Sequence, residues 1–202
     1  YGAFTSIKVD GEEQLADKTI LSAFRAPTDN DKNVKARWAN INIWQGENLD
    51  CSFAKVYDCG LKDGKISVIG SLAGVSRVPL LNYAVNIDIS ENGAITFDLN
   101  CDIRKDAFWL PRLGFEFVLP ESANKFTYYG SGPIESYCDM HHWAHVGIYE
   151  SDTDREYVNY VMPQEHGNHT ASKMLKIGNM KFQSDETFDF NVSNYNSEML
   201  TK

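Results

Sequence analysis

The chain has 202 residues, 43% of them apolar and 23% charged, which is typical of a globular protein with a sizeable core. Its net charge is −9, from 19 basic and 28 acidic residues, and such a surface repels phosphate backbones, which argues against a nucleic-acid partner. No stretch approaches about 18 consecutive apolar residues, so neither a membrane-spanning helix nor a membrane partner is expected.

Alternation of apolar and polar residues, typical of half-buried strands, recurs along the chain in short segments. These segments are, in chain order, 4–9, 65–68, 82–89, 95–103, 114–117 and 188–192. The dipeptides Asp10-Gly11 and Asp63-Gly64 mark turns, and Asn92-Gly93 predicts a tight hairpin turn with positive φ angles. A single short helix is expected at 34–43. The pattern predicts one all-β domain over residues 1–202, an antiparallel β-sandwich.

The four cysteines include no Cys-x-x-Cys pair, so neither zinc binding nor thioredoxin-like chemistry is indicated. Cys101 alternates in step with apolar neighbours and is predicted to be a buried free thiol. A disulfide, if one forms, is expected between Cys51 and Cys59.

Residues 25–31 read RAPTDND and follow an apolar run at 19–24. Three side chains match the first three ligand positions of a calcium loop: Asp29, Asp31 and Asn33. Val34 then replaces the glycine of that loop, and Asn40 replaces its closing glutamate, which argues against calcium. The segment is interpreted instead as a loop whose Asp and Asn side chains bond nearby backbone amides.

Arg25 gives this loop a further feature, because a guanidinium beside two carboxylates suggests an ion-pair clamp. The sequence predicts that Arg25 pairs with Asp29 or Asp31 and that Asn30 points outward.

Two histidine groups are also candidates for a site. His141, His142 and His145 form H-H-x-x-H, but the HExxH pattern is absent, so a polar surface or interface group is preferred over zinc. The loop 162–170 carries His166 and His169 and suits either a sugar-facing loop or a well-satisfied structural turn. No metal-binding residue is predicted.

The chain contains ten Tyr, eleven Phe and four Trp. Tyr and Trp rings can stack on the C–H faces of sugars, while Asp, Asn, Gln and His read hydroxyl groups. Aromatic side chains also dominate sandwich cores, which is the preferred interpretation for any single ring. A retaining glycosidase needs two carboxylates about 5–5.5 Å apart, and the sequence nominates no such pair.

Five stretches in order resemble the last β-sandwich domain of glycoside hydrolase family 2 β-galactosidases. They are LSAFRAPTDND at 21–31, WLPRLG at 109–114, YYGSGPIESYCD at 128–139, MPQEHGN at 162–168 and the strand at 188–195. The resemblance covers nearly the whole chain and implies an antiparallel supersandwich similar to galactose mutarotase. It also implies that the catalytic glutamates and a magnesium ion belong to a separate α/β barrel, which nothing in this chain resembles.

The resemblance therefore implies a non-catalytic accessory domain that walls the substrate cleft of a retaining β-galactosidase, an enzyme that hydrolyses terminal β-D-galactose residues. The isolated chain is expected to be inactive and to hold no cofactor. Its expected partners are the other domains of the same polypeptide and a shared galactoside. The cleft edge is predicted at Arg25, Asp29, Asn30, Asp31, Glu165 and Asn168. The sequence does not fix whether the parent is a homo-oligomer, or whether it is cytoplasmic or periplasmic in bacteria.

Some positions depart from the family pattern. Asn33 stands where the family often has Gly, and Met140 and His169 stand where it often has Arg, which removes the arginines of those ion pairs. The family's domain continues past the strand at 188–195, so the chain is expected to be a fragment, either truncated or different at its C-terminus. Two alternatives stay open: an independent galactoside-binding module, and an aldose epimerase-like domain using His142 or His145 with a carboxylate base.

Overall fold

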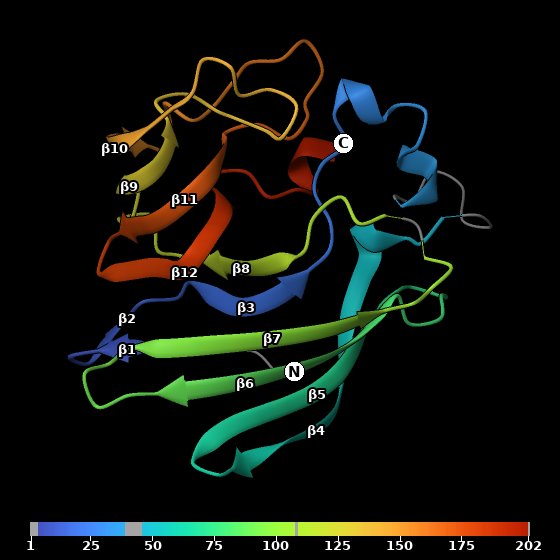
Figure 1. Cartoon of the computed structure of the whole chain (residues 1–202), viewed down its shortest axis with the longest axis vertical. Coiled ribbons are helices and arrows are strands. Elements are labelled where there is room, and N and C mark those ends of the chain that lie inside the picture. The colour runs from blue at the N-terminus through green and yellow to red at the C-terminus, as the bar shows by residue number, and fades with distance from the viewer. Residues whose placement is uncertain (1–3, 39–45, 108, 202) are drawn as a thin grey trace. The chain divides into compact units, whose positions relative to one another are not determined.

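The computed structural model describes residues 4–38, 46–107 and 109–201, and it is built from antiparallel β-strands joined by turns and short 3-10 segments (Figure 1). The predicted all-β antiparallel class is confirmed, and the sheets are consistent with a β-sandwich. The chain divides into two compact units. The first unit combines Tyr1–Thr5 with Lys18–Phe117, and the second combines Ser6–Asp17 with Val118–Lys202. The assignment of residues 1–202 to one domain stays a prediction.

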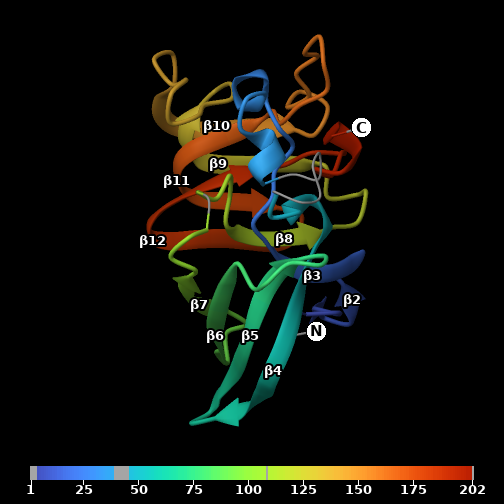
Figure 2. The same cartoon turned by 90° about the vertical axis from the view of Figure 1, so that its right-hand side faces the viewer.

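The first unit contains a four-stranded antiparallel sheet in the order β4-β5-β6-β7, and nearly all of a two-stranded sheet of β3 and β8 (Figure 2). The strands are β3 (Asp17–Ser22), β4 (Ser52–Lys62), β5 (Lys65–Gly74), β6 (Leu81–Ile89), β7 (Ile95–Ile103) and β8 (Gly114–Val118). In the described part of the segment between β3 and β4 there are three 3-10 turns, Asp29–Asp31, Lys35–Arg37 and Leu49–Cys51.

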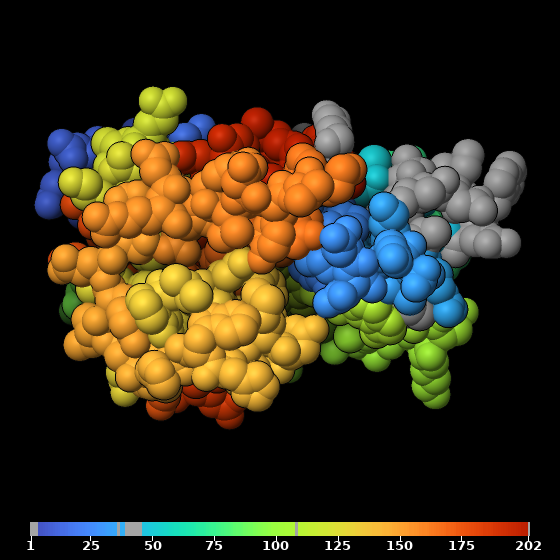
Figure 3. All heavy atoms as spheres, turned by 90° about the horizontal axis from the view of Figure 1, so that it is seen from above, coloured from blue at the N-terminus to red at the C-terminus, as the bar shows by residue number. Residues whose placement is uncertain are grey.

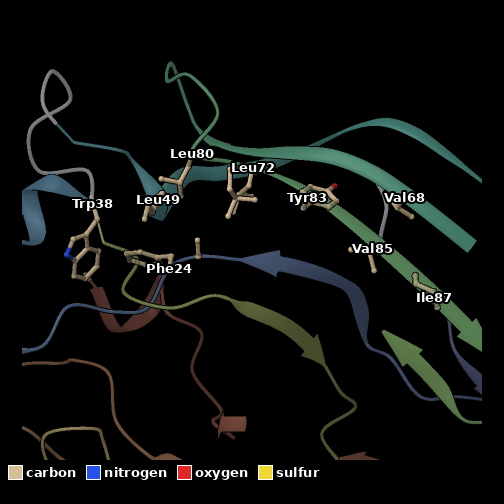
Figure 4. Close-up of a cluster of buried hydrophobic side chains, with 11 residues drawn as sticks. Phe24, Trp38, Leu49, Val68, Leu72, Leu80, Tyr83, Val85 and Ile87 are labelled. Atoms are coloured by element: carbon tan, nitrogen blue, oxygen red, sulfur yellow. The ribbon is translucent and has the colours of Figure 1, made fainter. Parts of the chain in front are cut away.

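The core of the first unit forms because the alternating residues of β5 and β6 place their apolar side chains on one face of the sheet. Val68, Leu72, Tyr83, Val85 and Ile87 are all at most 6% exposed and belong to one apolar cluster (Figure 4). Side chains from outside that sheet complete the cluster, among them Phe24, Trp38 and Leu49. Full burial of such a side chain stabilises the fold by about 1.5–3 kcal/mol.

The second unit contains the short hairpin of β1 (Lys8–Val9) and β2 (Glu12–Glu13) and a four-stranded antiparallel sheet in the order β10-β9-β11-β12. The strands of this sheet are β9 (Lys125–Gly132), β10 (His145–Asp152), β11 (Asn168–Ile177) and β12 (Met180–Asn191), and a 3-10 turn, Met199–Thr201, follows them. One face of the sheet carries its own apolar cluster of Phe126, Tyr128, Leu175, Ile177 and Phe190.

The predicted hairpin at 82–103 is confirmed, since β6 and β7 pair in register from Leu81 with Ile103 to Ile89 with Ile95. The predicted turn is wrong in detail. Gly93 has φ +82°, but Asn92 is not among the residues with positive φ. A five-residue connection forms instead, because the Asn92 side chain accepts hydrogen bonds from the Ala94 amide and the Ser90 hydroxyl.

Other local predictions had mixed outcomes. Asp63-Gly64 is a two-residue hairpin turn with φ +50° and +81°, and Asp10-Gly11 has the same character. The strand expected at 4–9 is limited to Lys8–Val9. The helix expected at 34–43 is reduced to the 3-10 turn Lys35–Arg37 where the structure describes it, and 39–43 lie outside the described residues.

None of the four cysteines forms a disulfide, including Cys51 and Cys59, and Cys101 is partly buried against the core of the first unit.

Candidate functional site

The polar loop at 25–31 begins shortly after β3 ends, next to a run of buried side chains. Ala23 and Ala26 are completely buried, and Phe24 is 6% exposed. The Arg25 side chain between them remains 17% exposed. The apolar residues therefore anchor the strand end in the core of the first unit, and Arg25 leaves that core toward the 3-10 turn Asp29–Asp31.

The predicted ion pair is confirmed for Arg25 with Asp31. Arg25 Nη1 donates to Asp31 Oδ2 at 2.6 Å, and Nη2 donates to Oδ1 at 3.2 Å, in a two-point arrangement. Asp31 Oδ2 also accepts from the Thr28 amide at 2.7 Å and the Thr28 hydroxyl at 2.8 Å. Burial alone would raise the pKa of Asp31, but the hydrogen bonds from Arg25 and Thr28 outweigh it, and the pKa is lowered.

The guanidinium of this ion pair also contacts an aromatic ring. The Arg25 guanidinium carbon is 5.6 Å from the centre of the Trp38 ring, within the range of a cation–π contact. Trp38 is completely buried and packs edge-on to Phe24, with ring centres 5.9 Å apart. Its indole Nε1 has no hydrogen-bond partner among the described residues. Arg25 is therefore held both by the Trp38 ring and by the Asp31 carboxylate.

Asp29 and Asn30 are the exposed polar residues of the 3-10 turn, whereas Asp31 is 5% exposed. Figure 3 shows the segment around these residues, in blue, at the molecular surface. The predicted outward position of Asn30 is confirmed. The loop is thus a self-bonded element in which the side chains of Asp29 and Asn30 are exposed.

Glu165 and Asn168, the other two residues predicted at a cleft edge, belong to the second unit and are 3% and 7% exposed. The Asn168 side-chain amide donates to the Ser136 backbone carbonyl at 2.9 Å, and the Ser136 backbone amide donates to the Asn168 backbone carbonyl at 2.7 Å. Asn191 Nδ2 lies 3.4 Å from Glu165 Oε1. The loop thus has the bonding expected of a structural turn, and a role for either side chain at a cleft edge stays a prediction.

A buried carboxylate that the sequence did not nominate organises this loop. Glu135 is 8% exposed and accepts from the Gly167 amide at 2.8 Å, the Tyr137 hydroxyl at 3.3 Å and the Tyr160 hydroxyl. Burial, the hydrogen bond to Glu135 and the charge of Glu135 raise the pKa of Tyr160 to about 12. Glu135 lies within the stretch at 128–139, so its place in that family motif was the feature of the sequence that could have identified it.

His169, which stands where the family often has Arg, forms a second buried polar centre in this unit. Its Nε2 lies 2.8 Å from Glu156 Oε2, and its Nδ1 lies 3.1 Å from Ser131 O. A carbonyl only accepts, so Nδ1 carries a proton and donates it to Ser131 O. Burial and then the charge of Glu156 raise the pKa of the neighbouring Tyr128.

The histidines of the H-H-x-x-H pattern are exposed, and the rings of His141 and His142 lie 5.2 Å apart. Over residues 4–38, 46–107 and 109–201, no group of three His, Cys, Asp or Glu side chains is placed to hold a metal ion. Within the same ranges, no helix has the length and apolar character needed to cross a membrane.

Comparisons with known proteins identify the family of the chain. The family model described as "Beta galactosidase small chain" matches residues 1–202. A β-galactosidase of Actinobacillus pleuropneumoniae is 30% identical over 205 residues, which cover 100% of this chain and 20% of that protein. One of Staphylococcus xylosus is 29% identical over 93% of this chain, and one of Kluyveromyces lactis is 27% identical over 95%. The chain spans about a fifth of the length of these curated relatives.

The antiparallel sheets make this an all-β protein, consistent with a β-sandwich. The family match narrows this fold class to one family, because it extends over residues 1–202. The chain belongs to the β-galactosidase small-chain family.

Proposed function

We propose that this chain is a non-catalytic accessory domain of a retaining β-galactosidase of glycoside hydrolase family 2, and that it walls the substrate cleft of that enzyme. The observation that carries the proposal is the match of the whole chain to the small-chain family, within relatives that are named β-galactosidase and are about five times longer. Hydrolysis of terminal β-D-galactose residues would then be an activity of the longer polypeptide.

The loop at 25–31 is the part of the chain best suited to a wall. Its backbone is fixed by the Arg25–Asp31 pair, so it would lose little conformational freedom when a substrate is held against it. Asn30 and Asp29 are the exposed polar groups that could face a sugar hydroxyl. Glu165 and Asn168 are buried in the second unit, so their contribution would be to hold the loop 162–168 in shape.

Both catalytic carboxylates of a retaining mechanism are assigned to other domains of the same polypeptide, together with the magnesium ion. The purified 202-residue chain should therefore release no nitrophenol from a nitrophenyl β-D-galactoside above the buffer rate. Preparation from a host that lacks its own β-galactosidase removes the main source of false activity. Turnover that co-purifies with the chain and scales with its concentration would contradict the accessory role.

The cleft role is tested separately in the longer polypeptide. Asn30→Ala and Asp29→Ala should each lower kcat/KM about two- to tenfold, the loss expected for one hydrogen bond to substrate. Glu91→Ala, which changes an exposed residue in the β6–β7 connection, is the matched control and should leave kcat/KM unchanged. Unchanged kinetics in both loop variants, with normal folding, would remove the loop from the cleft.

A further inference from the structure

Two exposed tyrosine rings meet on the second unit. Tyr157 comes from the connection between β10 and β11, and Tyr195 comes from the segment after β12. Their ring centres are 5.4 Å apart at an interplanar angle of 50°, yet they remain 46% and 42% exposed. In Figure 3 the loop that carries Tyr157, in orange, forms part of the visible surface. Core packing does not account for two contacting rings that stay in water.

Buried groups hold this pair of rings in place. His166 is 3% exposed and meets the Tyr157 ring edge-on, with ring centres 5.2 Å apart. Asn191 Nδ2, at the end of β12, donates to His166 O and so ties the loop to the segment that leads to Tyr195. Gly167 has φ +70°, and a Cβ there would lie 3.0 Å from Glu156 O, so the two sides of the loop approach closely. The rings are therefore pre-positioned for a ligand.

Polar groups with spare hydrogen-bonding capacity lie near the two tyrosines along the chain or, for His166, in contact with one of them. Asn194 Nδ2 donates to Asp154 Oδ1 at 3.2 Å, and both residues are exposed. Among the described residues, Asn194 Oδ1 and Asp154 Oδ2 have no hydrogen-bond partner. His166 Nδ1 donates to Gln164 O at 2.9 Å, which leaves Nε2 without a partner among the same residues. The segments that carry the two rings thus also carry an amide and a carboxylate, and an imidazole contacts Tyr157.

Two other exposed rings of the described chain, Tyr57 and Trp143, are already engaged. The Tyr57 hydroxyl is bonded to Ser71 Oγ at 2.8 Å, and the Lys55 ammonium lies 5.5 Å from the Tyr57 ring centre. The Trp143 indole N–H donates to Glu135 O at 3.1 Å. Tyr57 is therefore a suitable control for Tyr157, because its ring is also exposed but already contacts Lys55 and bonds to Ser71.

We propose that Tyr157 and Tyr195, together with Asn194, Asp154 and His166, form a carbohydrate-binding surface that takes one pyranose ring of a galactoside. The C–H face of the sugar stacks on the tyrosine rings, and its hydroxyls bond to the amide, the carboxylate and His166 Nε2. The acidic chain and Asp154 itself disfavour an anionic ligand such as a nucleotide. The choice of a galactoside over other pyranosides rests on the proposed function.

The test is a titration of the ¹⁵N-labelled 202-residue chain with methyl β-D-galactopyranoside and with lactose, followed by NMR. Amide shifts should concentrate at 154–157, 166–167 and 193–195. Tyr157→Ala and Tyr195→Ala should each weaken binding about two- to tenfold, as expected for loss of one aromatic contact. Tyr157→Phe should retain binding because it keeps the ring, and Tyr57→Ala should bind like the unchanged chain.

The spread of amide chemical shifts and the urea unfolding midpoint are measured for each variant. A variant that keeps both but binds less sugar has lost binding rather than its fold. The proposal is overturned if neither sugar shifts any of these amides, if the shifts lie only at 25–33, or if the folded alanine variants bind normally. None of these outcomes bears on the accessory role, which depends on the turnover assays of the chain and of the longer polypeptide.

Discussion

The Arg25 guanidinium makes two hydrogen bonds, of 2.6 and 3.2 Å, to the Asp31 carboxylate while it lies over the buried Trp38 ring. Thr28 supplies two more donors to the same carboxylate, so Asp31 is held by both of its neighbours within one short loop. These bonds hold the loop in one shape, and a role for Arg25 or Asp31 at a cleft edge stays a prediction. The polar segment after β3 is therefore a clamp, with the exposed residues Asp29 and Asn30 beside it.

Removal of Asp31 should destabilise the fold through this clamp. Asp31→Ala leaves the Arg25 guanidinium, 17% exposed, without its carboxylate and frees the Thr28 amide. Hydrogen bonds to charged groups contribute about 1.5–3 kcal/mol, so we expect the free energy of unfolding to fall by about 2–3 kcal/mol. Urea unfolding followed by tryptophan fluorescence measures it. Asn30→Ala, at an exposed neighbour, should change stability by less than about 0.5 kcal/mol, and an equal loss there would contradict the clamp.

Acid should weaken the same clamp. The pKa of Asp31 is lowered in the folded chain, whereas an unfolded Asp titrates at about 3.9. The folded state then binds a proton less readily than the unfolded state, so the contribution of Asp31 is fully present above the unfolded pKa. It is lost as the pH falls from that value through the lower folded pKa. The stability difference between the unchanged chain and Asp31→Asn should therefore shrink below about pH 4. Urea unfolding over a pH series checks this, and a constant difference would argue against it.

Sequence spacing explains which of these features could be predicted. Arg25 and Asp31 are six residues apart, and the alternation of β6 and β7 is local, so both were accessible from short windows. Glu135 could not be found in this way, because Tyr160 and Gly167 are 25 and 32 residues away and join it only through the fold. The β6–β7 turn was mispredicted although it is local, because the Asn92 side chain, rather than its backbone angle, organises it.

The buried pair of His169 and Glu156 should respond strongly to loss of one partner. His169→Ala removes the group bonded to Glu156 Oε2 in a site where both side chains are at most 6% exposed. An unpartnered buried charge typically costs about 3–5 kcal/mol, and the remaining bond from Ser151 to Glu156 offsets part of it. We expect a loss of about 2–4 kcal/mol in urea unfolding.

Two variants sharpen the test of this pair. His142→Ala removes an exposed imidazole of the same unit and should change stability by less than about 0.5 kcal/mol. His169→Ala combined with Glu156→Gln removes the buried charge, so the double variant should be more stable than His169→Ala alone. A double variant no more stable than the single one would show that Glu156 is not the source of the loss.

The Glu135 carboxylate should control the ionisation of Tyr160. The pKa of Tyr160 is raised to about 12 by burial, by its hydrogen bond to Glu135 and by the charge of Glu135. Glu135→Gln keeps the size of the side chain but removes its charge, so the pKa of Tyr160 should fall from about 12 toward its ordinary value near 10. Alkaline titration by tyrosinate absorbance follows the change.

The contribution of Tyr160 must be separated from those of the other tyrosines, since the chain has ten. The substitution Tyr160→Phe deletes its hydroxyl, so the absorbance lost on this substitution at each pH gives the titration curve of Tyr160 alone. The same subtraction is made in the Glu135→Gln background. If the two difference curves have the same midpoint, then burial rather than Glu135 sets this pKa.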